Sequence, residues 1–259
     1  MKYGIVIQQR VNVQEKPSFS AERGSELLLF ETVKVLGPEE GEWIQIQCGH
    51  DEYQGWIGRN QICGISEKDF KRLHSGNVFV SSRTAKMRYF TPDFQVREVS
   101  LGTPLPGALR DMEPRIVSGK KRNSVELPAH KRRRVVQDFA QKFLGTLYSW
   151  GGRSIYGVDC SGFTQVVYRF VGVSLPRNAS QQAFHGEEVP FENKLIGDLA
   201  FFKNQAGSIT HVGIVFPGGK IIHAKGFDEV RVDTLTEKGI SDKRGTQTHI
   251  LACIRRVIA

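Results

Sequence analysis

The hydrophobic pattern of this chain changes near Pro128, and that change limits the folds open to it. Before Pro128, short apolar runs alternate with turn signals and show little helical spacing. After it, two segments with apolar residues three and four positions apart come first, and strand-like runs follow Gly197. This order indicates an all-β region ahead of an α+β domain.

The region before Pro128 has the pattern of small β-barrels. The runs "ELLLFETVKVLG", "EWIQIQC" and "GWIGRNQI" read as strands joined by Gly-rich or acidic turns. A second stretch follows with "NVFVSS", "KMRYF" and "FQVREVSLGTPLPG". We expect two barrels, residues 1–65 and 66–127, with Tyr89 and Phe90 packed in the second.

The α+β domain is expected to span residues 128–259. The segment "RRRVVQDFAQKFLG" places Val135, Val136, Phe139 and Phe143 on one helical face and ends at a glycine. A second helix is predicted after Cys160, with the apolar residues Phe163, Val166, Val167 and Phe170. The later strands are predicted in "DLAFF", "THVGIVF", "KIIHAKG" and "HILACIRRV".

Composition is that of an ordinary globular protein. The chain has 259 residues, 39% apolar and 24% charged, and no run approaches the roughly 18 apolar residues of a membrane span. The N-terminal residues lack the pattern of a secretory signal, so we expect a cytoplasmic protein if this is the natural start. The four cysteines match no zinc-site spacing, so we expect reduced thiols, no metal and no cofactor.

Much of the formal net charge of +9 lies in residues 119–134, "GKKRNSVELPAHKRRR". This stretch is either a contact for a polyanion or a solvated linker with the first turns of a helix. The second interpretation is favoured because no stacking aromatic residues are interleaved with the basic ones. We expect no nucleic-acid or membrane partner and a monomeric protein.

Cys160, in "VDCSGFTQ", lies at the first position of a predicted helix. A lone cysteine beside an apolar helix is more often structural than reactive. At this position, however, unpaired backbone N–H groups and the helix dipole favour a thiolate, which is the nucleophilic form of cysteine. Such a nucleophile needs a base, usually a histidine that a third group orients.

Two histidines lie in the predicted strands after the helix, His211 in "THVGIV" and His223 in "IIHAKG". With a loop of two or four residues in "FPGGK", His223 would lie opposite Ile214, on the other face from His211. A three-residue loop, 217–219, sets His223 opposite Gly213 and diagonal to His211 on the same face. Three-residue loops commonly need a left-handed glycine, which this loop contains, so we predict the three-residue loop.

That register makes Cys160 a candidate nucleophile, His211 its base and His223 the group that sets the tautomer of His211. Taken singly, each histidine is more often a core or surface residue. The combination favours catalysis, because the cysteine begins a helix and both histidines are compatible with one sheet face.

Several separated motifs resemble the NlpC/P60 family of papain-like cysteine peptidases. They are "LGTLYSWGGRSIYGVDCSGF", "LPRNASQQ", "GDLAFF", "THVGIV" and "IIHAKG", and the resemblance covers residues 135–257. The first half, with "VNVQEKPS" and "GWIGRNQI", resembles a bacterial SH3-like barrel. The whole chain resembles the branch that recycles cell-wall peptides, in which two such barrels precede the peptidase, although residues 66–127 match poorly.

The resemblance implies a papain-like α+β domain that hydrolyses the bond between γ-D-Glu and an L-diamino acid in murein peptides. The substrate would carry a free N-terminal L-Ala, and the product would be L-Ala-γ-D-Glu. The family's nucleophile, base and third polar residue correspond to Cys160, His211 and His223. Its oxyanion-binding tyrosine corresponds to Tyr148, for which packing in the core is an equal alternative.

The resemblance also implies a set of substrate-binding residues. Those in the peptidase domain are Asp159, Ser161 and Ser180, and those in the first barrel are Tyr53 and Glu26, with Glu31 as the rival acid. Asp159 would pair with the substrate's ammonium group, since a buried ammonium needs a carboxylate. Helix capping is the alternative for Asp159 and for Ser180.

Other functions remain compatible with the sequence. They are a secreted wall endopeptidase whose barrels bind intact murein, a non-catalytic binding module with an inert Cys160, and an acyltransferase with the same nucleophile and base. Whether the diamino acid is lysine or diaminopimelate stays open.

Overall fold

A computed structural model describes residues 1–74, 78–88, 96–105, 115–118, 120–123 and 127–258. The chain divides into two compact units. Unit 1 comprises Met1–Val125 and Trp150–Tyr156, and unit 2 comprises Glu126–Ser149 and Gly157–Ala259. The main division lies close to the predicted boundary at 127, but the short segment around Arg153 groups with unit 1.

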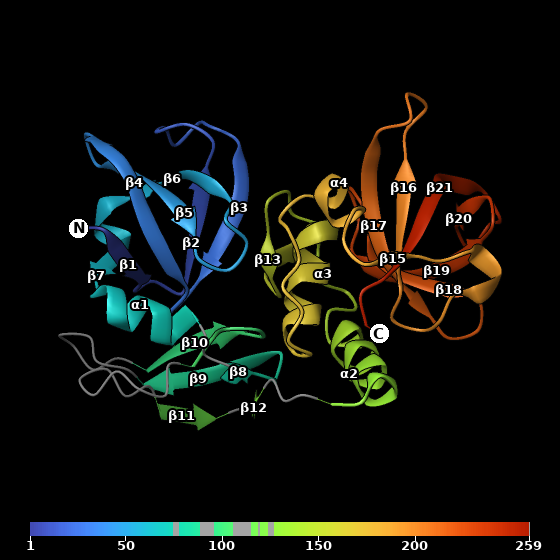
Figure 1. Cartoon of the computed structure of the whole chain (residues 1–259), viewed down its shortest axis with the longest axis horizontal. Helices are drawn as coiled ribbons and strands as arrows, with labels where there is room; N and C mark the ends of the chain where they lie inside the picture. Colours follow the sequence, from blue (N-terminus) through green and yellow to red (C-terminus); the bar gives the residue numbers. More distant parts are fainter. Residues whose placement is uncertain (75–77, 89–95, 106–114, 119, 124–126, 259) are drawn as a thin grey trace. The chain divides into compact units, whose positions relative to one another are not determined.

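Unit 1 contains a β-barrel built from seven strands in the order β3-β2-β6-β5-β4-β1-β7 (Figure 1). The strands are β1 (Tyr3–Val6), β2 (Arg10–Gln14), β3 (Arg23–Leu28), β4 (Thr32–Glu40), β5 (Trp43–Cys48), β6 (Gln54–Gly58) and β7 (Ile62–Gly64), with the short helix η1 (Arg59–Gln61) before β7.

Alternation along the strands builds the barrel core. In β5, Ile44, Ile46 and Cys48 are buried while the residues between them are half-exposed. This period of two is what a strand with one buried face requires. The same cluster includes Val11 and Val13 of β2.

Two strand predictions in this region are wrong. The run "GWIGRNQI" was predicted as a strand, but β6 ends at Gly58 and the helix η1 separates it from β7. The run "ELLLFETVKVLG" was predicted as a single strand, but β3 ends at Leu28 and β4 begins at Thr32. The chain turns between them with Phe30 in the left-handed region at φ 66°. Continuous hydrophobicity hides this turn because Leu29 and Phe30 are themselves buried in a second apolar cluster.

The rest of unit 1 comprises a helix, two small sheets and one further strand. Its elements are α1 (Glu67–His74), β8 (Val78–Val80), β9 (Thr84–Arg88), β10 (Val96–Ser100), β11 (Arg115–Ser118), β12 (Lys121–Asn123) and β13 (Arg153–Ser154). The sheets have the orders β10-β9-β11 and β12-β8. A second barrel over 66–127 stays a prediction, and Tyr89 and Phe90 lie outside the described residues.

Unit 2 is built on a seven-stranded antiparallel sheet in the order β15-β21-β16-β17-β18-β19-β20. The strands are β15 (Glu187–Glu188), β16 (Leu199–Lys203), β17 (Ile209–Phe216), β18 (Lys220–Ala224), β19 (Val230–Thr236), β20 (Gly239–Ser241) and β21 (Gln247–Arg256). An additional pairing of β20 with β21 closes the sheet on itself. The four strands predicted after Gly197 are confirmed.

Helices lie beside this sheet (Figure 1). They are α2 (Ala129–Gln141), α3 (Cys160–Arg169) and α4 (Ala179–Gln182), with β14 (Gly157–Val158) before α3 and the short helix η2 (Phe191–Asn193) before β16. The predicted apolar faces of both long helices are buried, and Phe139 stacks on Phe170 at 3.8 Å between ring centroids. None of the helices in the described ranges is long and apolar enough to cross a bilayer.

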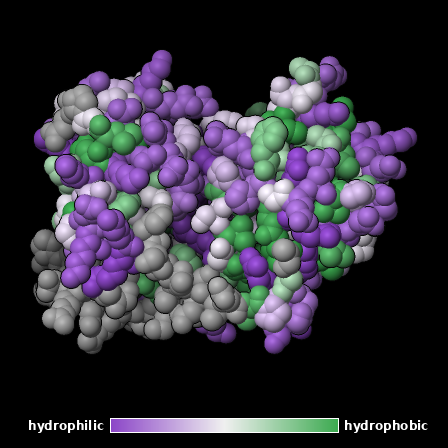
Figure 2. Space-filling view, viewed as in Figure 1, coloured by the Kyte–Doolittle hydropathy of each residue, from purple (hydrophilic) through white to green (hydrophobic). Residues whose placement is uncertain are grey.

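The surface of unit 2 is mixed in character. On the face shown in Figure 2, hydrophobic patches lie among hydrophilic side chains. Single large apolar residues such as Leu147, Phe184 and Phe227 are exposed, which is normal for a globular surface.

Candidate active site

Cys160 is the first residue of α3, as predicted. Asp159 is the N-cap, and its Oδ1 accepts a hydrogen bond from the Gly162 N–H at 2.7 Å. The cap forms because β14 ends one residue earlier and Asp159 keeps an extended backbone before the helix turns. The Cys160 side chain is therefore held at a helix start, and the residue is 7% exposed.

The prediction that this position makes the thiol easier to ionise is wrong for the free protein. Burial and the negative charge of Asp159 raise the pKa of Cys160 to about 12, against hydrogen bonds from the Val212 and Ser161 N–H groups and the charge of Arg177, which lower it. Desolvation outweighs the helix terminus. The resting side chain is a neutral thiol that needs a base when it reacts.

The hairpin of β17 and β18 has the predicted three-residue loop. Phe216 pairs with Lys220 and Ile214 with Ile222, which leaves residues 217–219 in the loop. Gly218 and Gly219 both have positive φ, at 71° and 68°. This register places the side chains of His211 and His223 on one face, as the sequence predicted.

The two imidazoles form a hydrogen bond in which His211 Nε2 lies 2.8 Å from His223 Nδ1. His211 is 6% exposed and His223 is fully buried. Burial and the neighbouring imidazoles of His223 and His249 hold the pKa of His211 well below its usual range. At neutral pH His211 is therefore an uncharged imidazole, which is the form that accepts a proton.

Two further residues contact the His211–His223 pair and were missed by the sequence analysis. Asp233 on β19 lies with its Oδ2 3.2 Å from Nε2 of His223. His249 on β21 stacks on His211 with 4.4 Å between ring centroids, and burial lowers its pKa to about 4. In the described part of the chain, no three His, Cys, Asp or Glu side chains are arranged to hold a metal ion.

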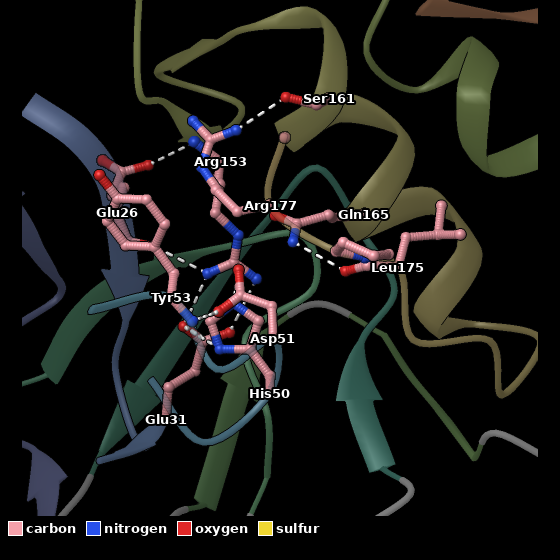
Figure 3. A network of polar contacts seen from close by, with 12 residues as sticks. Glu26, Glu31, His50, Asp51, Tyr53, Arg153, Ser161, Gln165, Leu175 and Arg177 are labelled. Carbon is pink, nitrogen blue, oxygen red and sulfur yellow. Dashed lines mark hydrogen bonds and ion pairs between the residues drawn. The ribbon is translucent and has the colours of Figure 1, made fainter. Parts of the chain in front are cut away.

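A second polar network holds the start of α3. Arg177 donates to both carboxylate oxygens of Asp159 and to the Ser161 hydroxyl, the last at 2.8 Å. All three residues are at most 5% exposed. Figure 3 shows Arg177 reaching Ser161, with Gln165 of the same helix bound to the Leu175 carbonyl. The capping alternative for Asp159 is thus observed, with an arginine partner that sequence reasoning missed.

Tyr148 and Ser180 have different surroundings. The backbone of Tyr148 forms an isolated β-bridge with Val158, which lies two residues before Cys160. Its side chain is half-buried, and burial with the negative charge of Asp159 raises its pKa, so its hydroxyl stays a donor. Ser180 is exposed on α4 and is not the cap of that helix, because Asn178 occupies the N-cap position.

The two predicted substrate residues of unit 1 lie in and beside the barrel. Glu26 is 1% exposed, and its carboxylate accepts from the Arg153 backbone N–H at 2.9 Å (Figure 3). Its rival Glu31 is paired with the Arg153 guanidinium at 2.9 Å. The hydroxyl of Tyr53 lies against Gly24, where even a methyl group would clash with it.

Comparison with known proteins gives two family matches. The model of the NlpC/P60 family matches residues 145–248, and the model of the bacterial dipeptidyl-peptidase Sh3 domain matches residues 13–62. The first range contains Cys160, His211 and His223, and the second lies within the barrel of unit 1.

Relatives extend the match over most of the chain. A gamma-D-glutamyl-L-lysine dipeptidyl-peptidase of Bacillus subtilis (strain 168) is 32% identical over 81% of this chain and 75% of its own length. A protein of the same name from Bacillus cereus is 28% identical over 75% of this chain and 67% of its own length. A crystal structure of an NlpC/P60 family protein from Bacillus cereus superimposes with a TM-score of 0.80, covering 99% of this chain and 100% of that one at 20% identity.

Proposed function

Because this chain belongs to the NlpC/P60 family and is a cysteine peptidase, we propose that it cleaves the bond between γ-D-Glu and an L-diamino acid in murein peptides with a free N-terminal L-Ala. The product would be L-Ala-γ-D-Glu, and the role would be recycling of cell-wall peptides in the cytoplasm. The shared name of the two Bacillus relatives supports L-lysine as the diamino acid.

The proposal assigns catalysis to Cys160, His211 and His223. The sulfur of Cys160 attacks the γ-carbonyl carbon of D-Glu while His211 takes the thiol proton. The carbon–nitrogen bond then breaks, and His211 gives this proton to the departing amine of the diamino acid. Water next attacks the thioester, losing a proton to His211, and the carbon–sulfur bond breaks as that proton returns to the sulfur.

The observation that carries this proposal is the hydrogen bond between His211 and His223 beside a cysteine at a helix start. The Val212 N–H, next to His211 in the chain, donates to the Cys160 sulfur. The thiol therefore lies next to the backbone of β17, the strand that carries His211. The thiol and the His211 imidazole are both uncharged at neutral pH. A buried neutral pair of this kind suits general-base activation of the thiol as it attacks.

Other residues take supporting roles in the proposal. Tyr148 would help to hold the oxyanion, which its retained hydroxyl proton allows. Asp159 and Ser161 would bind the substrate ammonium, although Asp159 shares its carboxylate with Arg177. Ser180 is accessible for a polar contact with the substrate, and the roles of Tyr53 and Glu26 stay predictions from the resemblance.

A second candidate function is hydrolysis of intact wall murein. Proteins named probable endopeptidase p60 match at 43% identity over 86 residues in Listeria innocua, but this is 33% of this chain and 18% of theirs. The match favours a shared peptidase domain, and it says less about the whole chain than the Bacillus relatives do. A requirement for a free substrate amine separates the two functions.

The test compares L-Ala-γ-D-Glu-L-Lys, the corresponding diaminopimelate peptide and the N-acetylated form of each. Products are identified by mass spectrometry with the wild type and with Cys160→Ala. We expect cleavage of the free peptides only, release of L-Ala-γ-D-Glu, and no turnover by the variant. Equal cleavage of free and acetylated peptides would contradict the amine requirement and favour the wall endopeptidase.

A further inference from the structure

Three neighbouring strands of unit 2 carry a continuous chain of hydrogen bonds that ends at a carboxylate. His211 on β17 contacts His223 on β18 at 2.8 Å, and His223 Nε2 contacts Asp233 Oδ2 on β19 at 3.2 Å. Their exposed fractions are 6%, 0% and 3%. Because Asp233 pairs across from Ile221, two residues before His223, it reaches that ring diagonally along one sheet face.

The charge state of Asp233 follows from its other partner. Its Oδ1 accepts from Arg231, with Nε at 3.2 Å and Nη2 at 3.1 Å, and Arg231 is held in turn by Asp228 at 2.9 Å. Burial alone would raise the pKa of Asp233, but the hydrogen bond from His223 and the charge and hydrogen bond of Arg231 outweigh it and lower that pKa. Asp233 is thus ionised and can only accept hydrogen bonds, so Nε2 of His223 carries a proton.

The tautomer of the second ring sets that of the first. Burial and the charges of Arg231 and Lys225 lower the pKa of His223 against the opposing effect of Asp233, so His223 is neutral and has one N–H. Its Nδ1 must then accept, and His211 Nε2 must donate. The other nitrogen of His211, Nδ1, keeps its lone pair.

The proposed mechanism needs this lone pair on the side of the thiol. Nδ1 is the imidazole nitrogen nearer to its own main chain, and the Cys160 sulfur accepts from the next main-chain N–H, that of Val212. The ring of His249 stacks on that of His211, and Nδ1 of His249 forms a hydrogen bond with the Thr248 hydroxyl. The ring therefore has one defined orientation between two neighbours.

We propose that Asp233 is a positioning residue of the peptidase: acting through His223, it sets the tautomer of His211 in which Nδ1 is the basic nitrogen. This inference rests on the proposed roles of Cys160 and His211. Asp233 contacts His223 rather than the base or the thiol, so it influences the base only through His223. When Nδ1 takes the thiol proton, the Nε2–H of His211 still donates to His223, and the new cation lies one ring away from the carboxylate.

Asp233→Asn is the decisive substitution. Its side-chain amide can donate to His223 Nε2, which turns His223 Nδ1 into a donor and forces His211 to carry its proton on Nδ1. The base then points its N–H at the thiol. We expect kcat to fall by roughly 10²- to 10⁴-fold, as a wrong tautomer does elsewhere, with KM changed little. Asp233→Glu, which restores a carboxylate, should recover part of the activity.

The matched control is Asp228→Asn. It makes the same chemical change to the other carboxylate on Arg231, but Asp228 has no contact with either histidine among the described interactions. We expect kcat within about twofold of the wild type. A fall in kcat equal to that of Asp233→Asn would show that loss of the arginine pairing, rather than the tautomer, is responsible, and would overturn the inference.

A spectroscopic measurement separates positioning from simple structural support. In long-range ¹H–¹⁵N spectra of the ¹⁵N-histidine-labelled wild type, we expect His211 with a protonated Nε2 and an unprotonated Nδ1, and the reverse in Asp233→Asn. A wild-type His211 protonated on Nδ1 overturns the inference even if the variant fails to fold. If the wild type cleaves no murein peptide, the proposed function fails, but the spectra still test whether Asp233 sets the tautomer of His211. If Cys160→Ala is inactive and Asp233→Asn keeps full kcat, the proposed function stands and only the role of Asp233 is wrong.

Discussion

The imidazoles of His211 and His223 meet at 2.8 Å across a strand position that is occupied by a glycine. A Cβ at Gly213 would lie 2.9 Å from the Cβ of His223 and 2.7 Å from the nearest carbon of Ile221. Real side chains do not tolerate such distances, so the close approach of the two rings depends on the missing side chain at this position.

Gly213→Ala should therefore separate the two rings. His223 is fully buried and cannot move outward, so we expect the strands to part locally, with at least a tenfold loss of kcat and about 1–3 kcal/mol of stability. Gly218→Ala is the control, because it strains a left-handed loop residue with open space around it. Its stability should fall by about 1 kcal/mol with activity unchanged. Equal kcat in both variants would contradict this account.

The cap of α3 gives a second prediction. Asp159→Ala removes the helix cap and leaves the buried Arg177 guanidinium without its carboxylate, so unfolding in urea should show a loss of about 3–5 kcal/mol. Asp159→Asn keeps a capping oxygen and should lower the free energy of unfolding by about 1 kcal/mol less than Asp159→Ala does. In Asp159→Ala/Arg177→Met the cost should be smaller than the sum of the single changes, since no charge is left unpaired; strict additivity would show that the two side chains do not interact.

Stability should depend on pH through the histidine cluster. Burial lowers the pKa of His211, His223 and His249 in the folded chain, the last to about 4. Below about pH 6.5 the unfolded chain binds protons that the folded chain does not, so stability is lost as the pH falls. We expect the Tm of the wild type to drop between pH 7 and pH 5, and to drop less in His249→Gln. A Tm that is constant over this range would be inconsistent with neutral buried imidazoles.

Unit 1 has a buried ion pair that can be tested separately. Arg153 is fully buried and its guanidinium binds the Glu31 carboxylate at 2.9 Å and the backbone oxygen of Glu26 at 2.7 Å. Arg153→Met leaves Glu31 buried without this cation and should destabilise the protein by about 3–5 kcal/mol. Arg10→Met removes a half-exposed partner of Glu26 and should cost under about 1 kcal/mol by the same denaturation measurement. The prediction is wrong if the two variants are equally stable.

The sequence allowed the hairpin that carries His211 and His223 to be predicted because its register depends on loop length. A loop with two glycines between "THVGIVF" and "IIHAKG" left few pairings, and only one put both histidines on the same face. The helix start at Cys160 was predictable for a similar reason, since a polar cap followed by apolar residues at helical spacing is a local signal.

Asp233 and Arg177 were not predictable in the same way. The strand β19, "VRVDTLT", buries Asp233 while Val232 is half-exposed, which inverts the alternation by which a strand is read from sequence. The one feature that could have pointed to Asp233 is an acidic residue among the β-branched residues of this strand. Arg177 meets Asp159 across a separation of 18 residues, and no local pattern specifies such a partner. The pKa of Cys160 also depended on burial, which the helix position alone does not reveal.

The most direct test of a cysteine nucleophile is to trap the acyl-enzyme. Single turnovers with excess enzyme and L-Ala-γ-D-Glu-L-Lys are quenched in acid, and the intact protein and its peptides are examined by mass spectrometry. The account predicts an L-Ala-γ-D-Glu adduct on Cys160 that forms and decays, and none in Cys160→Ala. Release of the dipeptide by Cys160→Ala, or an adduct on another residue, would contradict it.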